Sequence, residues 1–529
     1  MTAQASIRSY LNQAYLLGLL MMAVGLTLSP FLMGMANFWL VLVWLTDGFA
    51  NRDFKEKFTR FWHNKAAVVL ALFYLMHVIG LLWTSDFQYA MKDLRVKLPI
   101  LVLPFVMSSM PPLDRKRFDV VMLVYVLSVF VATLFSFSRF VRHDYDDIRD
   151  ISRFISHIRF CLNIVFCIAI VGYSLFSRRS PWWGKAVQVL LLFWFVYQIE
   201  IFESLSGYVI LAAVAVVSAV YAFLRWKTAK GWRVAVGMAA LAVVALAVAI
   251  VWHEAKPLLK VETVDFNSLE QQTAQGNPYM HDTLHYPVED GKFVGLYYCR
   301  PELQEAWSQR SDLPFDGLTA NGENLEATLA RYLTSKGLRK DAEGVLSLAN
   351  DDIRNIEQGI ANYNNWKHPG LRARLSSTLF EYNLYRRFNN PNGGSLSQRI
   401  EFTRASFHII KQHPWFGVGT GDVPMAFSAA YDEIQSPLND EFRFRAHNQY
   451  LAITVAFGLV GLAFFLFVLL YPWLASRKSH TYLYMVFLSI MLLSMLAEDT
   501  LETQAGASMF AFFEALLLFA YPAENETKK

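Results

Sequence analysis

Residues 443–473 read RFRAHNQYLAITVAFGLVGLAFFLFVLLYPW, so two arginines and a histidine run directly into more than twenty mostly apolar residues. A helix that spans a membrane needs about 20 predominantly apolar residues, and this stretch is long enough. Charged side chains at the edge of the hydrocarbon are costly and are seldom kept without a use. The stretch therefore indicates a membrane protein with a polar site at one membrane surface.

The composition of the chain indicates the same class of protein. Of its 529 residues, 54% are hydrophobic and 17% are charged, whereas about 25% are charged in a typical soluble protein. The formal net charge of +4 is small, and no basic patch is interleaved with aromatic residues, so we expect no nucleic-acid partner. Cys161, Cys167 and Cys299 show neither a paired framework nor a CxxC metal spacing. We expect Cys161 and Cys167 to be small packing residues.

Apolar stretches recur along the chain and predict an all-α polytopic membrane protein with about twelve transmembrane helices. The first stretch has no clear cleavage site and is followed by many more, so we interpret it as a retained anchor and not as a signal peptide. The candidate spans are residues 10–28, 30–49, 66–83, 97–110, 118–138, 157–176, 186–202, 205–224, 234–252, 447–474, 481–497 and 505–521.

The charges of the connecting loops predict how these spans are oriented. Lys and Arg favour the cytoplasmic side of a membrane. The short loops at 202–204 and 498–504 contain neither residue, whereas alternate loops are basic, namely residues 51–65, 114–117, 177–185, 225–233 and 476–480. We therefore expect both termini in the cytoplasm and residues 253–446 on the opposite side of the membrane.

This topology predicts three regions. Residues 1–252 would be a transmembrane region of about nine helices, residues 253–446 a helical extramembrane domain, and residues 447–529 a second transmembrane region of about three helices. Within the domain, residues 322–363 predict two helices, and Asp341 is suited to cap the second. No HExxH spacing or carboxylate partner suggests a metal site at any of its histidines, which are His253, His281, His285, His368, His408 and His413.

His447 is expected in the first turn of the tenth span, with Asn448 and Tyr450 beside it. The positive end of the helix dipole and the nearby lipid both favour a neutral imidazole, the form that a general base requires. Arg443 and Arg445 keep their charge and match phosphate geometry. This pattern suits a reaction in which a hydroxyl is activated while a lipid-linked phosphate leaves. The alternative is that the arginines contact lipid headgroups and His447 caps the helix.

A second motif precedes this histidine. Residues 395–423, SLSQRIEFTRASFHIIKQHPWFGVGTGDV, predict an amphipathic helix that ends at His413 and Pro414, followed by a glycine-rich turn. Without the strand and helix of a dinucleotide site, such a turn is weak evidence of phosphate binding. We expect Asp422, at its end, to bond the local backbone.

These elements together resemble the O-antigen ligase and polymerase superfamily, whose members are membrane glycosyltransferases of the GT-C type. The resemblance rests on QR in the helix, HPWFGVGTGD after it, and RAHNQYL running into GLVGLAFF. Further stretches are similar to a branch of ligase-like proteins with a large periplasmic domain: DLRVKLPILVLPF (93–105), SRFISHIRFCL (152–162), GNPYMHD (276–282), TLARYLTSKGLRKDAEGV (328–345) and MLAEDTLETQAGASMFAFF (495–513). The motifs are more specific for the superfamily than for ligase over polymerase.

The resemblance implies roles for particular residues. His447, in the HNxYL element, would activate the acceptor hydroxyl. Arg399, on the helix before HPxxGVG, would hold the donor diphosphate, and Arg404 is a second candidate. Leu205 stands where many members have an arginine in an SRxG-like element. Arg159, at the outer end of the sixth span, could supply the missing cation or could form a structural pair with an acid.

Two further groups of charges have more than one interpretation. Lys92, Arg95 and Lys97 are expected in an outer loop, where Lys97 could bind the lipid diphosphate or merely contact lipid headgroups. Three acids are expected between the last two spans, where they could orient His447, bind sugar hydroxyls or simply be solvated. These acids are Glu498, Asp499 and Glu502.

The resemblance therefore implies an inverting, metal-independent glycosyltransferase of a Gram-negative inner membrane, without a cofactor. It would move a glycan from undecaprenyl diphosphate to a sugar hydroxyl of lipid A–core at the periplasmic face, with both substrates entering from the membrane lipids. Beside His447 and Arg399, the substrate would be bound by Lys97, Arg159, Arg404, Arg443, Arg445 and Asn448. The alternatives are an O-antigen or exopolysaccharide polymerase, a protein O-oligosaccharyltransferase of the same superfamily, and a transporter of lipid-linked glycans. A transporter often shows internal repeats, and we find no matching halves.

Overall fold

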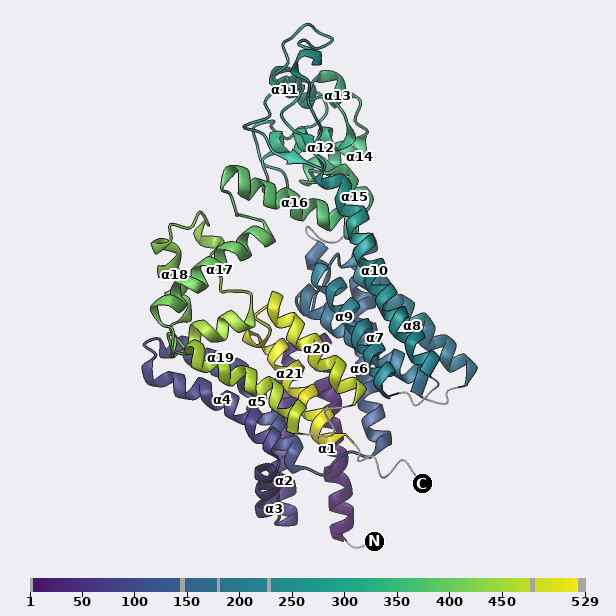
Figure 1. Ribbon diagram of the computed structural model, residues 1–529, viewed down its shortest axis with the longest axis vertical. Helices are drawn as coiled ribbons and strands as arrows, with labels where there is room; N and C mark the ends of the chain where they lie inside the picture. Colours follow the sequence, from purple (N-terminus) through teal and green to yellow (C-terminus); the bar gives the residue numbers. More distant parts are fainter. Residues whose placement is uncertain (1–2, 143–147, 178–180, 226–229, 476–480, 522–529) are drawn as a thin grey trace. The chain divides into compact units, whose positions relative to one another are not determined.

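The computed structural model describes residues 3–142, 148–177, 181–225, 230–475 and 481–521, which are mostly helical (Figure 1). By their internal contacts they form two compact units. Unit 1 consists of residues 1–244, 401–436 and 443–529, and unit 2 consists of residues 245–400 and 437–442. By these contacts, residues 401–436 group with the apolar helices of unit 1.

Unit 1 is built from apolar helices and a few short polar ones. Its N-terminal part contains α1 (Ala3–Leu28), α2 (Pro30–Asn51), α3 (Phe54–His63), α4 (Lys65–Ile79), α5 (Phe87–Ser109), α6 (Arg115–Arg142), α7 (His157–Ser177), α8 (Trp182–Ile201) and α9 (Leu205–Arg225). Helix α10 (Lys230–Leu259) continues into unit 2. The C-terminal part contains α18 (Val423–Glu433), α19 (Gln449–Ala475), α20 (Tyr482–Ala497) and α21 (Gln504–Ala515).

Each of the twelve expected spans coincides with a helix, and eight described helices are long and apolar enough to cross a membrane. These are Ile7–Leu28, Pro30–Asn51, Lys65–Trp83, Arg115–Arg142, His157–Phe176, Trp182–Ile201, Leu205–Leu224 and Gln449–Ala475. Helices α20 and α21 are apolar but shorter. The structure confirms an all-α polytopic membrane protein, but not the count of twelve. Of the basic loops that predict its orientation, residues 178–180, 226–229 and 476–480 lie outside the described residues.

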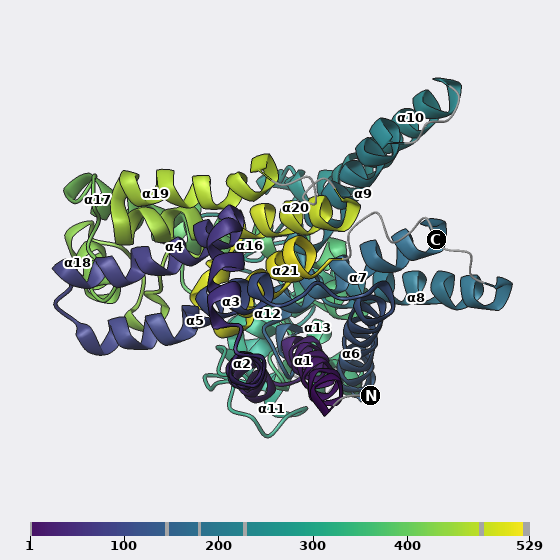
Figure 2. The same ribbon diagram turned by 90° about the horizontal axis from the view of Figure 1, so that it is seen from below.

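Helix α5 differs most from its predicted extent. It begins at Phe87, where the Asp86 side chain accepts a hydrogen bond from the Tyr89 backbone N–H, and not near residue 97. The prediction missed this first part because its charged residues lower the local hydropathy. Lys92 and Lys97 therefore lie on a helix and not in an outer loop. Helix α5 packs against α4, which also contacts α19, and the three lie side by side in both views (Figures 1 and 2).

Helix α19 is interrupted at Gly458, whose φ of 66° is left-handed. The glycine-rich turn supplies hydrogen bonds at the break: Val418 N–H donates to the Val455 carbonyl and Gly419 N–H to that of Ala456. On the other side, Leu459 N–H donates to the Pro414 carbonyl at 2.8 Å. A Cβ at Gly458 would lie 2.2 Å from the Trp415 carbonyl carbon, so this close approach requires glycine.

The glycine-rich turn is therefore a structural partner of the broken span. Its N–H groups at Val418 and Gly419 are already used, so they are not free to bind phosphate. Asp422 accepts hydrogen bonds from the backbone N–H groups of Ser85 and Asp86. The prediction that Asp422 bonds the local backbone was wrong, because its partners lie at the start of α5.

Unit 2 is a small helical domain with one short hairpin. Its helices are α11 (Arg300–Ser308), α12 (Leu325–Lys336), α13 (Ala342–Leu346), α14 (Asn350–Glu357), α15 (Tyr363–Lys367) and α16 (Leu371–Phe388). Helix α17 (Ser395–Gln412) begins in unit 2 and ends in unit 1. Residues 322–363 form three helices and part of a fourth, not two. The Asp341 cap is confirmed, because its side chain accepts a hydrogen bond from Gly344 N–H.

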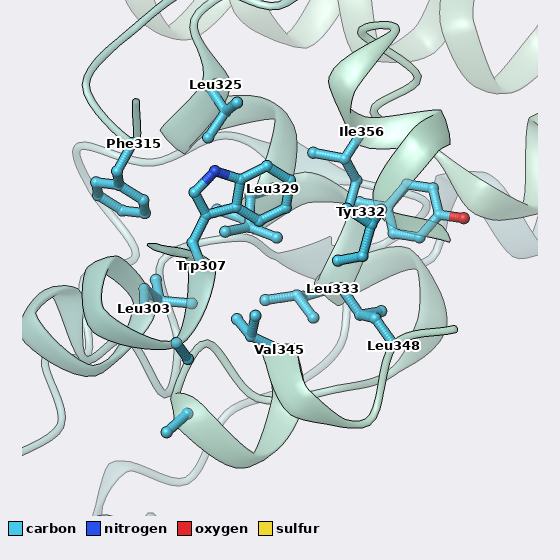
Figure 3. Close-up of a cluster of buried hydrophobic side chains, with 14 of the residues drawn as sticks. Leu303, Trp307, Phe315, Leu325, Leu329, Tyr332, Leu333, Val345, Leu348 and Ile356 are labelled. Atoms are coloured by element: carbon cyan, nitrogen blue, oxygen red, sulfur yellow. The ribbon is translucent and has the colours of Figure 1, made fainter. Parts of the chain in front are cut away.

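The core of unit 2 forms around Trp307 and Tyr332, both fully buried (Figure 3). Trp307 N–H donates to the Leu313 carbonyl, and the Tyr332 hydroxyl donates to Asp352, so both polar tips are satisfied. Figure 3 shows aliphatic side chains of α11, α12, α13 and α14 gathered around these rings, namely Leu303, Leu325, Leu329, Leu333, Val345 and Ile356. This apolar cluster explains how so small a unit keeps a defined shape.

Candidate functional site

His447 lies in the segment that leads into α19, and its φ of 44° is left-handed. The helix begins at Gln449, and the side chain of Asn448 accepts a hydrogen bond from Leu451 N–H at 3.0 Å. Asn448 is therefore the N-cap, and the alternative in which His447 caps the helix is wrong. The ring of His447 packs against Phe402, with ring centroids 5.4 Å apart, and its side chain is 34% exposed.

Two buried carboxylates face one nitrogen of the His447 ring. Its Nδ1 lies 3.8 Å from Glu498 Oε2 and 3.7 Å from Asp499 Oδ1. The same Nδ1 is buried and makes no hydrogen bond. Glu498 and Asp499 directly follow the end of α20 at Ala497. The short segment after this helix therefore sets the position of both acids. They place negative charge next to the ring, where two of the three acids expected between the last two spans could orient it.

Two arginines lie against the same carboxylates. Arg159 Nη2 is 3.9 Å from Glu498 Oε2 and 3.8 Å from Asp499 Oδ1. Arg445 Nη2 is 3.3 Å from Asp499 Oδ2. Arg159 comes from the first turn of α7, whereas Arg445 lies two residues before His447. The structure thus brings a histidine, two acids and two arginines together from three distant parts of the chain.

A second layer of charges supports this group. Lys97 Nζ lies 2.5 Å from Asp93 and 2.7 Å from Glu502, and its side chain is 2% exposed. Glu502 also contacts Arg445 Nη1 at 3.1 Å, and its other oxygen accepts a hydrogen bond from Gln449 at 3.0 Å. The adjoining cavity has a volume of only about 20 Å³. Lys97 therefore faces buried acids and has no room for a diphosphate.

The protonation of this group follows from burial and charge. Burial alone would raise the pKa of Glu502, but Lys97 and Arg445 hold that pKa well below its usual range. Burial also raises the pKa of Asp499, and Arg445 only partly opposes the effect. Burial would lower the pKa of Arg445, yet Glu502 and Asp499 keep it above its usual value. Glu502 is thus a fixed anion between two cations, whereas Asp499 accepts a proton more readily.

The other predicted binding residues lie in different surroundings. Arg443 donates to Asp432 at 2.7 Å, and its guanidinium lies over the Tyr431 ring. Arg404 donates to the fully buried Glu401 at 2.6 Å. Arg399 is half-buried on the part of α17 that belongs to unit 2, whereas His447 belongs to unit 1. Asn448 Nδ2 donates to the Leu496 carbonyl at 2.9 Å, which ties the cap to α20.

The ligand atoms of His447, Glu498 and Asp499 all lie within 4.8 Å of one another, a spacing that a metal ion could use. However, Arg159 and Arg445 already place two permanent positive charges within 4 Å of these carboxylates. A divalent cation would have to displace these two arginines or would be repelled by their charges. The donor set therefore does not favour a resident metal.

Sequence reasoning did not identify every member of this group. The acids at 498, 499 and 502 were given several possible roles, and Asp93 and Gln449 were missed. Tyr89 was missed too, although its hydroxyl accepts a hydrogen bond from Arg445 at 3.2 Å. A signal existed for Asp93, because an Asp and a Lys four residues apart on one helix face can pair. No such signal existed for Gln449, whose role depends on the fold of residues 498–502.

The fold and this site define an all-α polytopic membrane protein with a partly exposed histidine held in a buried ionic network. Residues 361–466 match the family described as O-Antigen ligase. The match runs from just before α15 into α19, and it includes Arg399, the glycine-rich turn and His447. No curated protein matches the chain. The match covers about a fifth of the chain and supports the O-antigen ligase superfamily, which the motifs resemble.

Proposed function

We propose that this protein is an inverting glycosyltransferase of the O-antigen ligase type. It would transfer a glycan from undecaprenyl diphosphate to a sugar hydroxyl of lipid A–core at the periplasmic face of the inner membrane. The observation that best supports this proposal is the position of His447, with Glu498 and Asp499 on one side of its ring and Arg159 and Arg445 beside them. A base that lies beside two carboxylates and two fixed cations suits transfer from an anionic leaving group.

In this mechanism His447 is the general base. Nε2, which does not face the carboxylates, takes the proton from the acceptor hydroxyl. The oxygen then forms a bond to the anomeric carbon of the donor, and the bond from that carbon to the diphosphate breaks. Glu498 and Asp499 orient the ring and balance the imidazolium that forms, as the carboxylate does in other base–carboxylate pairs.

The arginines assist the leaving group. The electron pair of the broken bond leaves with the diphosphate, whose added charge needs cations that cannot lose their proton. Arg399 is proposed for this role because it matches the arginine before HPxxGVG in the superfamily. Arg159 is proposed as the second cation, in place of the arginine that is absent at Leu205. Lys97, buried between Asp93 and Glu502, would support Arg445 and not touch the substrate.

The test compares cells that lack the gene after complementation with wild type, His447→Ala or His285→Ala at equal membrane abundance. His285 is 82% exposed in unit 2 and serves as the matched control. Loss of a general base lowers such rates by about 100-fold or more. We therefore expect His447→Ala to deprive lipid A–core of its glycan while long undecaprenyl-linked chains accumulate.

Other outcomes lead to different conclusions. If the undecaprenyl-linked chains shrink to single repeats, the protein is a polymerase of the same superfamily. If both the lipopolysaccharide and the lipid-linked pool match wild type, His447 is structural and the proposed mechanism is wrong. The control variant should match wild type in both pools.

A further inference from the structure

Unit 2 contains a groove that the proposed transfer reaction does not use. Its volume is about 470 Å³, within the range of about 300–1,000 Å³ that small-molecule sites occupy. Three segments line it: residues 262–269, the hairpin region 292–297, and the link between α12 and α13. The lining mixes carboxylates, hydroxyls, cations and the rings of Phe293 and Tyr297.

The walls of the groove are held by tight backbone geometry. The hairpin pairs β1 (Val288–Glu289) with β2 (Lys292–Phe293), and both turn residues, Asp290 and Gly291, have positive φ, as a two-residue hairpin turn requires. Glu262 accepts a hydrogen bond from Phe293 N–H at 3.0 Å, which joins the first segment to the hairpin. The groove is therefore a formed feature of unit 2.

Lys340 is one of the residues that line this groove, and it is 4% exposed. Its backbone is fixed on both sides, because its N–H donates to the Tyr297 carbonyl and its own carbonyl accepts from Cys299 N–H. Its Nζ donates one hydrogen bond, to the Leu296 carbonyl at 3.0 Å. Among the described residues, no carboxylate oxygen comes within 4.0 Å of this Nζ.

A buried ammonium without an acid partner is costly. Burial lowers the pKa of Lys340 to about 8, and Glu262 only partly opposes this. Each of the other buried lysines of the described chain, Lys57 and Lys97, has a carboxylate at 2.7 Å or less. An anionic ligand in the groove would supply the partner that Lys340 lacks.

We propose that this groove binds a carboxylated sugar residue, with its carboxylate at Lys340. The rest of the lining suits a sugar, because Thr263, Ser268 and Asp265 offer groups for hydroxyls and Phe293 offers an apolar ring face. Glu262 and Asp265 would repel a doubly charged phosphate more strongly than a singly charged carboxylate. The inference rests on the proposed function only in taking the ligand to be a glycan.

The experiment measures binding of methyl galacturonoside, which carries one carboxylate, and of its uncharged methyl ester to the full chain in nanodiscs, by calorimetry or saturation-transfer NMR. A charge-assisted hydrogen bond is strong enough that wild type should prefer the acid by about tenfold. Lys340→Met should abolish this preference. Lys367→Met, a change at a lysine outside the groove, should retain it. Because no transfer is measured, this result is independent of the His447 experiment.

Several results would overturn the proposal. One is equal binding of acid and ester by wild type, and another is an unchanged preference in Lys340→Met. If inorganic phosphate binds wild type and the galacturonoside does not, the groove is a phosphate site and not a uronate site.

The pH dependence of the wild type gives a second test if Lys340→Met does not fold. Binding of the acid should weaken between pH 7 and pH 9, as Lys340 loses its proton, and an unchanged affinity would contradict the proposal. The ester controls for the other charged or titratable groups around Lys340, which are Glu262, Asp265, Lys292, Tyr297, Cys299, Arg339 and Asp341.

Discussion

Lys97 and Lys340 are both buried but differ in what surrounds them. Lys97 is 2% exposed and lies within 2.7 Å of two carboxylates beside a cavity of about 20 Å³. Lys340 is 4% exposed, has a backbone carbonyl as its partner and lines a groove of about 470 Å³. The charge of Lys97 is used inside the protein, whereas that of Lys340 is available to a ligand. Burial alone therefore does not show what a lysine does.

The largest effect is expected from Lys97→Met. Without Lys97, Asp93 and Glu502 remain as buried carboxylates, and removing one partner of such a pair costs about 3–5 kcal/mol. We expect a clearly lower unfolding temperature for the purified protein in detergent, followed by fluorescence and size-exclusion chromatography. An unfolding temperature equal to that of wild type would show that the two acids are not held by Lys97.

A smaller effect is expected from Lys340, and it depends on pH. Its pKa in the folded chain is about 8, below the ordinary 10.5, so between these values the unfolded chain binds more protons. Stability should therefore rise with pH through this window, by at most about 3 kcal/mol. The measurement is the unfolding temperature of wild type minus that of Lys340→Met, from pH 7.5 to 9.5. A flat difference would mean that Lys340 is better solvated than the structure shows.

The smallest expected effect is the coupling between Lys97 and Glu502, which the double change Lys97→Met with Glu502→Gln measures. Removing the charge of Glu502 relieves part of the cost of losing Lys97, and its amide can still bond Gln449. Contacting residues couple by about 0.5–3 kcal/mol, so the double variant should be more stable than the sum of both single changes predicts. Strict additivity of the unfolding free energies would show that Lys97 and Glu502 act independently.

Much of the fold could be predicted from local patterns. All twelve apolar stretches are helical, the helix of residues 395–412 ends as expected before Pro414, and Asp341 caps α13. The failures occurred where charge and tertiary contact override local pattern. The first ten residues of α5 were missed because ion pairs such as Asp93 with Lys97 allow charged residues in a buried helix. The prediction joined the short helices α13 and α14 into one, because the residues between them, 347–349, include no glycine or proline.

The candidate site was only partly predictable. His447 and Arg445 could be chosen from the sequence, because charged residues beside apolar stretches are unusual. Arg159 was chosen from the resemblance, because Leu205 stands where many members have an arginine. The residues that pair with them could not be identified from the sequence. Glu498 and Asp499 meet His447 only when α20 packs beside α19, and Lys97 meets Glu502 only through the packing of α5 and α21.

The sequence by itself determined the class of protein, its helices, the motifs around His447 and the resemblance to the O-antigen ligases. These depend on composition and on short spacings that act locally. Tertiary structure alone decided which charges are paired, that the glycine-rich turn fills the break in α19, and that Lys340 lies in an open groove. The physical reason is that the effect of a charge depends on its neighbours within about 4 Å and on their burial, and residues distant in sequence supply both.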